Sequence, residues 1–144
     1  MKLFTIGYAS ATQGAVIARL KQAGVEVLID VRAVAASRRA GFSKRLLAAG
    51  LADAGIGYVH LRALGTPAAG RHAARAGRTA EMRAIFTDYL ENEPAAQAEL
   101  GEAQRIAATR PAALLCLESD ARVCHRALIA ARLKAMAGFE VVDL

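Results

Sequence analysis

Apolar residues recur along the chain in short runs that alternate with helical patterns. Five runs predict strands, at residues 2–6, 25–31, 58–61, 112–118 and 139–144. Several are apolar nearly throughout, which is typical of strands buried on both faces of a parallel sheet. The alternation of these runs with helical patterns therefore predicts an α/β fold.

Capping residues and glycines mark the ends of the predicted helices. Ser10 or Thr12 begins the first helix, which runs to about Ala23 and stops at Gly24. Ser43 begins the second. The remaining helices are predicted at roughly 79–91, 94–109 and 122–137. Residues 66–78, rich in Gly, Ala and Arg, are predicted to be an excursion from the core.

These elements predict a single three-layer domain over residues 1–144, with a mainly parallel five-stranded sheet and helices on both faces. The rule of right-handed crossovers favours a Rossmann-like strand order of 3-2-1-4-5. The first and fourth strands then lie side by side, where the winding of the sheet reverses. Ligands of open α/β sheets bind beyond the carboxyl ends of the strands at that place.

Polar residues follow the carboxyl ends of four predicted strands. They are Gly7, Tyr8 and Ser10 after the first strand, Asp30 and Arg32 after the second, His60 after the third, and Cys116 and Glu118 after the fourth. Because these ends share one edge of the sheet, distant segments should meet in one crevice. This convergence is the main reason to predict a functional site.

The net charge of +6 is unevenly distributed. Between Arg32 and Arg83, ten Lys or Arg face two acidic residues, whereas the remainder has nine basic and eleven acidic residues. The basic middle segment favours an anionic partner, either a phosphorylated small molecule or a nucleic acid, or is simply an Arg-rich surface. Within it, SRRAGFSKR (37–45) is a candidate anion clamp that includes Ser37.

The ends and the apolar runs bear on location. No apolar stretch has membrane-spanning length, and the first residues lack the pattern of a signal peptide. We therefore expect a cytoplasmic protein with no membrane partner. In that compartment the two cysteines, Cys116 and Cys124, are expected to stay reduced.

The segment CLESDARVCHR (116–126) holds the densest candidate chemistry. Ser119 or Asp120 is a candidate cap for the helix that follows, which places Cys124 and His125 in its first turns. A helix N-terminus and a neighbouring imidazole both favour the thiolate, so Cys124 is a candidate nucleophile or else a small buried residue. The C-x5-R spacing lacks the glycine of phosphate-cradling loops and is rejected as a phosphatase signature.

Two further readings of the segment stay open. Arg126 begins an apolar helical stripe. It would either hold an anion together with Arg32 or form an ion pair of its own with Asp30 or Glu118. A metal site at Cys116, Cys124 and His125 is an alternative, although C-x7-C-H matches no usual zinc spacing.

The motifs TIGYAS, LIDVR, SRRAGFSKR, YVHLRALG and LLCLESDARVCHR, in this order, resemble the bacterial and archaeal family called domain of unknown function 488 (DUF488). The resemblance spans nearly the whole chain and implies a compact α/β domain whose polar motifs gather in one place. It supports thirteen positions: Gly7, Asp30, Arg32, Ser37, Phe42, Tyr58, Leu64, Gly65, Cys116, Glu118, Cys124, His125 and Arg126. The chain departs from the family at Tyr8, where His is frequent, and at Ala35, Ala36 and Arg62, where Pro is frequent nearby.

Three hypotheses follow. The first is binding of an anionic phosphorylated or nucleotide-like ligand, with or without catalysis, in which Arg32 and Arg126 hold the anion. Asp30 and Glu118 would then handle protons or a metal, and Cys124 or His125 would react. The second is a non-catalytic nucleic-acid-binding module that uses residues 32–83, and the third is a metal or redox site at the two cysteines and His125. The sequence leaves enzymatic activity open and indicates neither a cofactor nor an oligomeric state.

Overall fold

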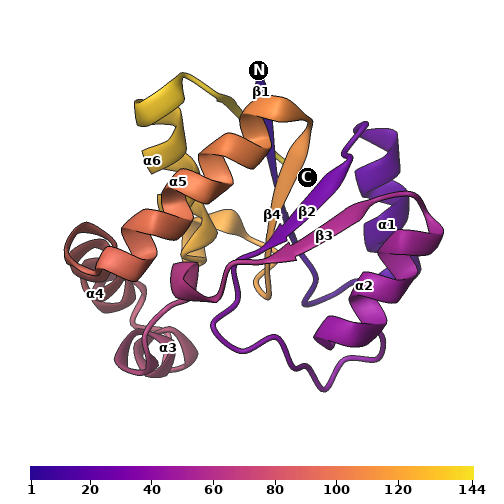
Figure 1. The fold of residues 1–144 in the computed structure, drawn as a ribbon. Helices are drawn as coiled ribbons and strands as arrows, with labels where there is room; N and C mark the ends of the chain where they lie inside the picture. Colours follow the sequence, from indigo (N-terminus) through magenta and orange to yellow (C-terminus); the bar gives the residue numbers. More distant parts are fainter.

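The computed structural model describes residues 1–144, and its five strands form one all-parallel sheet (Figure 1). The strands are β1 (Lys2–Gly7), β2 (Val27–Asp30), β3 (Gly57–His60), β4 (Ala112–Cys116) and β5 (Glu140–Asp143). Their order across the sheet is β3-β2-β4-β1-β5. The predicted α/β class with a parallel five-stranded sheet is confirmed.

Six α-helices connect the strands. They are α1 (Gln13–Gln22), α2 (Lys44–Asp53), α3 (Ala68–Arg75), α4 (Thr79–Asn92), α5 (Pro94–Thr109) and α6 (Arg126–Ala137). Two short 3₁₀ turns, η1 (Arg62–Leu64) and η2 (Ala121–Val123), precede α3 and α6. None of the helices combines the length and the apolar character that crossing a membrane requires.

The helices cover both faces of the sheet, because side chains of each strand alternate between two cores. Leu114 of β4 packs in the core under α3 to α6, whereas its neighbour Leu115 packs in the core under α1 and α2. Figure 1 shows α1 and α2 on one side of the strands and α5 and α6 on the other. The result is the predicted three-layer arrangement.

The strand order differs from the predicted 3-2-1-4-5 by the exchange of β1 and β4. All five residues of β4 are buried, so this strand occupies the centre of the sheet between β2 and β1. In β1, Thr5 donates a hydrogen bond to Asp143 of β5, so β1 has a polar partner toward the edge. The two strands remain neighbours, as expected.

Two sequence expectations differ locally from the structure. Residues 66–78, predicted to be an excursion, contain α3, whose Ala73 is fully buried in the larger core. Small residues such as Gly70 and Ala73 let this short helix pack closely against its neighbours. Because the segment lacks large apolar residues, the sequence does not show that it belongs to the core. The last helix begins at Arg126 rather than near residue 122, because Asp120 caps the separate turn η2 instead. Thr12, by contrast, caps α1 as predicted.

Candidate functional site

A cavity of about 440 Å³ opens beyond the carboxyl ends of β2 and β4. Its wall combines the segment after β2, helix α3, the end of β4 and the residues just before α6. The residues with polar or reactive side chains are Tyr8, Arg32, Thr66, Arg71, Arg75, Cys116, Glu118, Cys124 and His125. Segments far apart in the sequence therefore meet at this edge of the sheet.

The cavity lies beside the crevice that the topology suggested, because the loops after β1 and β4 touch. The amides of Tyr8 and Ala9 donate to the carbonyl of Leu117 at 3.1 and 2.8 Å. A Cβ at Gly7 would overlap the backbone of Glu118, so this close approach requires glycine. Backbone packing fills the space between β1 and β4, and the open volume lies toward β2. Gly7 thus shapes the site without lining it.

Asp30 and Arg32 form a buried ion pair behind the cavity. Arg32 donates to the Asp30 carboxylate from its amide, from Nε and from Nη2, at 3.1, 2.9 and 2.7 Å. Tyr58 donates to the same carboxylate, which is fully buried. Four hydrogen bonds therefore occupy the Asp30 oxygens, and the pair anchors the end of β2.

The remaining donors of Arg32 also point into the protein. Its Nη1 donates to the Tyr8 hydroxyl at 3.0 Å and to the Phe42 carbonyl at 2.7 Å. Burial lowers the pKa of Arg32, but hydrogen bonds and the charge of Asp30 outweigh this and raise it above its ordinary value. Tyr8 stacks on Phe42 with 4.4 Å between ring centroids. Arg32 therefore mainly fixes the loop from Ala33 to Phe42.

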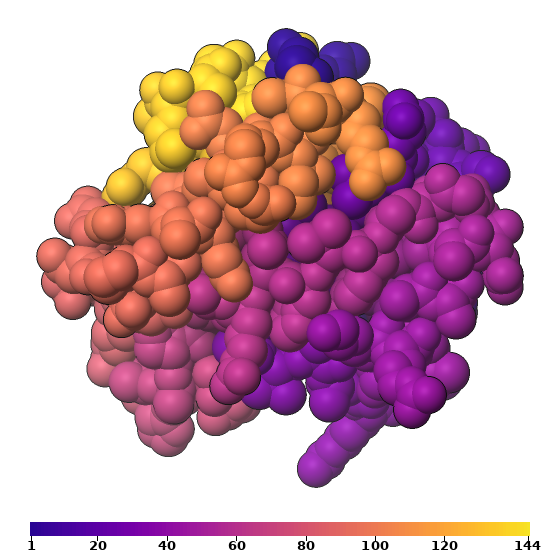
Figure 2. Space-filling view, in the orientation of Figure 1, coloured from indigo at the N-terminus to yellow at the C-terminus, as the bar shows by residue number.

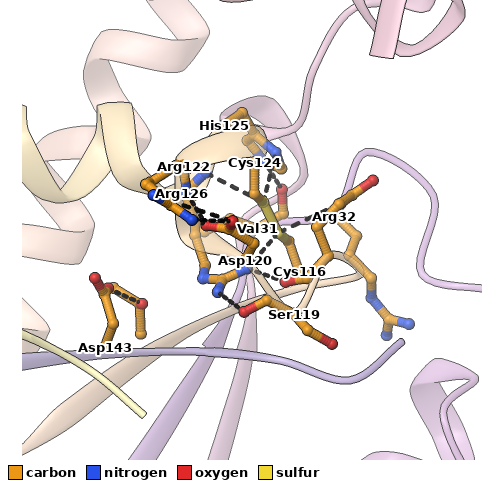
Figure 3. The surroundings of a disulfide bond; sticks show 12 residues. Val31, Arg32, Cys116, Ser119, Asp120, Arg122, Cys124, His125, Arg126 and Asp143 are labelled. Carbon is orange, nitrogen blue, oxygen red and sulfur yellow. Dashed lines mark hydrogen bonds and ion pairs between the residues drawn. A yellow bond between two sulfur atoms is a disulfide. The ribbon is translucent and has the colours of Figure 1, made fainter. Parts of the chain in front are cut away.

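The two cysteines meet at the wall of the cavity, where a disulfide joins Cys116 to Cys124 (Figure 3). Cys116 ends β4 and Cys124 immediately follows η2. The sequence led us to expect reduced thiols, and the disulfide corrects this expectation. The fold brings together two sulfurs whose residues are eight positions apart in the sequence. Each side chain is only 2% exposed, and the cavity is the route to the sulfurs.

His125 is held in one orientation beside the sulfurs. Its Nε2 lies 2.7 Å from the carbonyl of Val31, and its Nδ1 lies 3.7 Å from Cys124 Sγ. Because a carbonyl only accepts, Nε2 carries the proton and Nδ1 of the neutral ring presents its lone pair toward the sulfur. Burial lowers the pKa of His125 to about 4, so the ring is neutral near pH 7.

Arg126 is a fully buried cation with no carboxylate partner. It donates to the carbonyls of Glu118 and Ser119 and, at 3.3 Å, to Cys116 Sγ, while its Nε has no partner (Figure 3). Burial lowers the pKa of Arg126. The guanidinium thus binds the loop after β4 and, once the disulfide is reduced, would favour the thiolate of Cys116.

The other predicted site residues are spread around this centre. Glu118 lines the cavity, with its Oε2 4.0 Å from Cys116 Sγ. Ser10 lies outside the cavity lining, where its hydroxyl pairs with that of Ser119 at 2.9 Å. Ser37 lies in the basic loop and accepts a hydrogen bond from the amide of Arg39. The cavity therefore gathers Tyr8, Arg32, Glu118, Cys124 and His125, but not Ser10 or Ser37.

Sequence reasoning missed the cations of α3. Arg71 and Arg75 line the cavity, although GRHAARAGR (70–78) looks like ordinary surface in the sequence. They are four residues apart, and this spacing places two side chains on one face of a helix. If residues 68–75 had been predicted as a helix, Arg71 and Arg75 would have been recognised as two cations on one face.

The model of the family described as domain of unknown function DUF488 matches residues 12–133 of the 144. The matched region contains the disulfide, His125, Arg126 and the cations of α3. No curated protein and no solved structure gave a match.

Proposed function

We propose that this chain, which belongs to the DUF488 family, binds a small anionic ligand of the phosphorylated or nucleotide-like class in the cavity at the ends of β2 and β4. One observation carries the proposal. Arg71 and Arg75 line the same cavity as the sulfur pair and His125, and Glu118 is its only acidic lining residue. An anion held by α3 would therefore lie in reach of reactive groups.

The shape and polarity of the cavity support a ligand with an apolar part. Val34, Leu117 and Val123 line the cavity and are 57%, 44% and 40% exposed. Exposed apolar side chains around a concave site are typical of ligand-binding surfaces. In this proposal the phosphate lies against Arg71 and Arg75, and a base or other apolar group covers these three residues.

The same centre supplies candidate catalytic groups. In the reduced protein without a bound metal ion, Cys124 would be the nucleophile and Nδ1 of His125 the proton acceptor beside it. Glu118, rather than the saturated Asp30, is the carboxylate placed to handle a proton, because it lines the cavity. The buried guanidinium of Arg126 acts on Cys116 and on the loop, so a direct anion contact is assigned to α3 instead.

Replacing both Arg71 and Arg75 by Ala should remove ligand binding. With the wild type, we expect a member of a panel of phosphate, pyrophosphate, nucleotides and phosphosugars to raise the melting temperature by about 5 °C or more at saturating concentration. The double variant should lose this shift, because the half-buried Arg71, whose Nη1 also donates to the Thr66 carbonyl at 2.8 Å, and the exposed Arg75 are the proposed anion contacts. Thermal unfolding with and without each compound measures it.

The matched control replaces Arg19 and Arg105, two exposed helical arginines outside the cavity lining, by Ala. This variant has the same net charge as the first and should keep the shift. An equal loss of the shift in both variants would show nonspecific charge attraction and would contradict binding in the cavity.

A second candidate function, nucleic-acid binding, is favoured by one observation. Four cations of the loop before α2 and its first turn, Arg38, Arg39, Lys44 and Arg45, have no carboxylate partner. Figure 2 shows violet side chains of this part of the chain projecting at the lower edge of the molecule. Exposed cations without a carboxylate partner on one segment suit contacts to successive phosphates, although Arg39 also donates to the Ala11 carbonyl.

If this segment binds nucleic acid, affinity should fall steeply with salt. Four phosphate contacts imply a slope of log K against log salt concentration of roughly −3 to −4. Changing the four residues to Glu should abolish binding in fluorescence anisotropy with labelled DNA and RNA. Absent or salt-independent binding of the wild type would eliminate this candidate.

A further inference from the structure

We propose that Cys116, Cys124 and His125, once the disulfide is reduced, form a binding site for one Zn²⁺ ion at the wall of the cavity. Their ligand atoms, two sulfurs and an imidazole nitrogen, lie within 4.8 Å of one another. The inference concerns the sulfur centre itself and does not depend on anion binding.

The backbone places the two sulfurs at a spacing suited to a shared ion. The Cα atoms of Cys116 and Cys124 are 7.3 Å apart. Disulfides usually span about 4.4–6.8 Å between Cα atoms. Two thiolates on one tetrahedral zinc, with Zn–S bonds of about 2.3 Å, have sulfurs roughly 3.8 Å apart, which this wider backbone spacing accommodates.

His125 is already oriented as a third ligand. Its Nε2–H donates to the carbonyl of Val31 at 2.7 Å, which leaves the Nδ1 lone pair directed at Cys124 Sγ, 3.7 Å away. Metal-binding histidines usually donate their second ring N–H to a carbonyl or carboxylate, and this bond fixes the tautomer and the ring. The hydrogen bond to Val31 supplies that support.

Neighbouring groups stabilise two thiolates at this place. Cys116 Sγ receives a hydrogen bond from Arg126 Nη1 at 3.3 Å, and Cys124 Sγ receives one from the Arg126 amide at 3.5 Å. With Zn²⁺ bound, two thiolates and Glu118 contribute three negative charges, and the ion and Arg126 contribute three positive ones. The cluster is neutral, which matters because both cysteines and Arg126 are buried.

The types of the three ligand atoms favour zinc, and their number leaves one coordination position open to the cavity. Two thiolates and one imidazole suit zinc, and hard cations such as Mg²⁺ prefer oxygen ligands. Three protein ligands with a fourth position for water or substrate characterise catalytic zinc sites. All three ligand residues line the cavity, so the fourth position faces the space assigned to the ligand, with Glu118 beside it.

Zn²⁺ binding requires two steps, reduction of the disulfide and displacement of the thiol protons. An external dithiol reduces the Cys116–Cys124 disulfide to two thiols and is itself oxidised to a disulfide. Zn²⁺ then displaces the two thiol protons to solvent and binds two thiolates and neutral His125. An added disulfide reagent oxidises the two thiolates back to the Cys116–Cys124 disulfide, is itself reduced to two thiols, and so releases the ion.

Cobalt substitution tests the site in the full chain. Protein reduced with a phosphine and freed of reductant under argon is titrated with Co²⁺, then with Zn²⁺. We expect a thiolate-to-cobalt charge-transfer band, intense visible bands of tetrahedral cobalt, and loss of both at one Zn²⁺ per chain. The disulfide form should bind neither ion, and elemental analysis should find about one zinc per reduced chain.

Two histidine variants provide matched evidence. His125→Gln keeps a donor for the Val31 carbonyl but lacks Nδ1, and zinc affinity should fall about 100-fold or more because one of three bonds is lost. His60 also contacts a backbone carbonyl through Nε2, that of Arg32 at 2.8 Å, but lies outside the sulfur cluster. His60→Gln should therefore bind like the wild type.

The proposal is overturned if the reduced, folded wild type shows no charge-transfer band with Co²⁺. Equal zinc affinity in the His125→Gln and His60→Gln variants would also overturn it. Circular dichroism of each variant establishes that the fold is retained.

Discussion

Replacing Asp30 by Asn should lower the free energy of unfolding by about 3–5 kcal/mol at pH 7. The change leaves the Arg32 guanidinium buried without its counter-charge. Asp30 is 0% exposed and Arg32 6%, and Arg32 donates three hydrogen bonds to the Asp30 carboxylate. Such a loss is a large fraction of the stability of an ordinary domain. Urea unfolding followed by circular dichroism measures it.

The chain contains its own control for this prediction. Asp120 and Arg122 form an ion pair with the same two-residue spacing, but both side chains are exposed. Asp120→Asn should change stability very little, because solvent screens the pair. A variant with both Asp30→Asn and Arg32→Met should recover part of the loss, since no buried charge is then left alone. If Asp30→Asn costs no more than Asp120→Asn, the ion pair does not anchor the end of β2.

Acidification should destabilise the metal-free protein through His125. Burial lowers the pKa of His125 from 6.5 to about 4 in the folded protein. Between these values the unfolded chain binds a proton that the folded chain does not, so stability falls as the pH drops from 6.5 toward 4 and levels off below. The contribution of His125 between pH 7 and pH 4.5 is roughly 2–3 kcal/mol.

The measurement compares urea unfolding at pH 7 and pH 4.5 in the presence of a chelator. Carboxylates also titrate in this range, so the difference between variants is the informative quantity. His125→Gln should lose roughly 2–3 kcal/mol less than the wild type on acidification. His72→Gln, which alters an exposed histidine, should behave like the wild type. Identical losses in all three proteins would show that His125 does not titrate as described.

Much of the fold follows from patterns that act locally. The apolar runs ending at Asp30 and Cys116 become buried strands, and Thr12 caps α1, because period, burial and capping depend on neighbouring residues. Strand order depends on side chains that are distant in sequence. The Thr5 to Asp143 hydrogen bond, which ties β1 to β5, spans 138 positions and has no local signature.

The candidate site was predictable in part for the same reason. Its edge of the sheet follows from parallel strands whose carboxyl ends coincide, and the closeness of Cys116 to Cys124 and His125 follows from the short segment between the end of β4 and the start of α6. The saturation of Asp30 by Arg32 and Tyr58 does not follow, because a sequence cannot show which donors a carboxylate has already accepted. Nor does the cavity's shift toward β2, which results from the contact of Gly7 with the backbone of Glu118.

A crystal structure of the protein with the anion that gives the largest thermal shift would locate the ligand. We expect its phosphate between Arg71 and Arg75 and its remainder over the wall formed by Cys116, Cys124 and His125. Density for the anion at Arg38, Arg39, Lys44 or Arg45, with the cavity holding only water, would contradict this assignment.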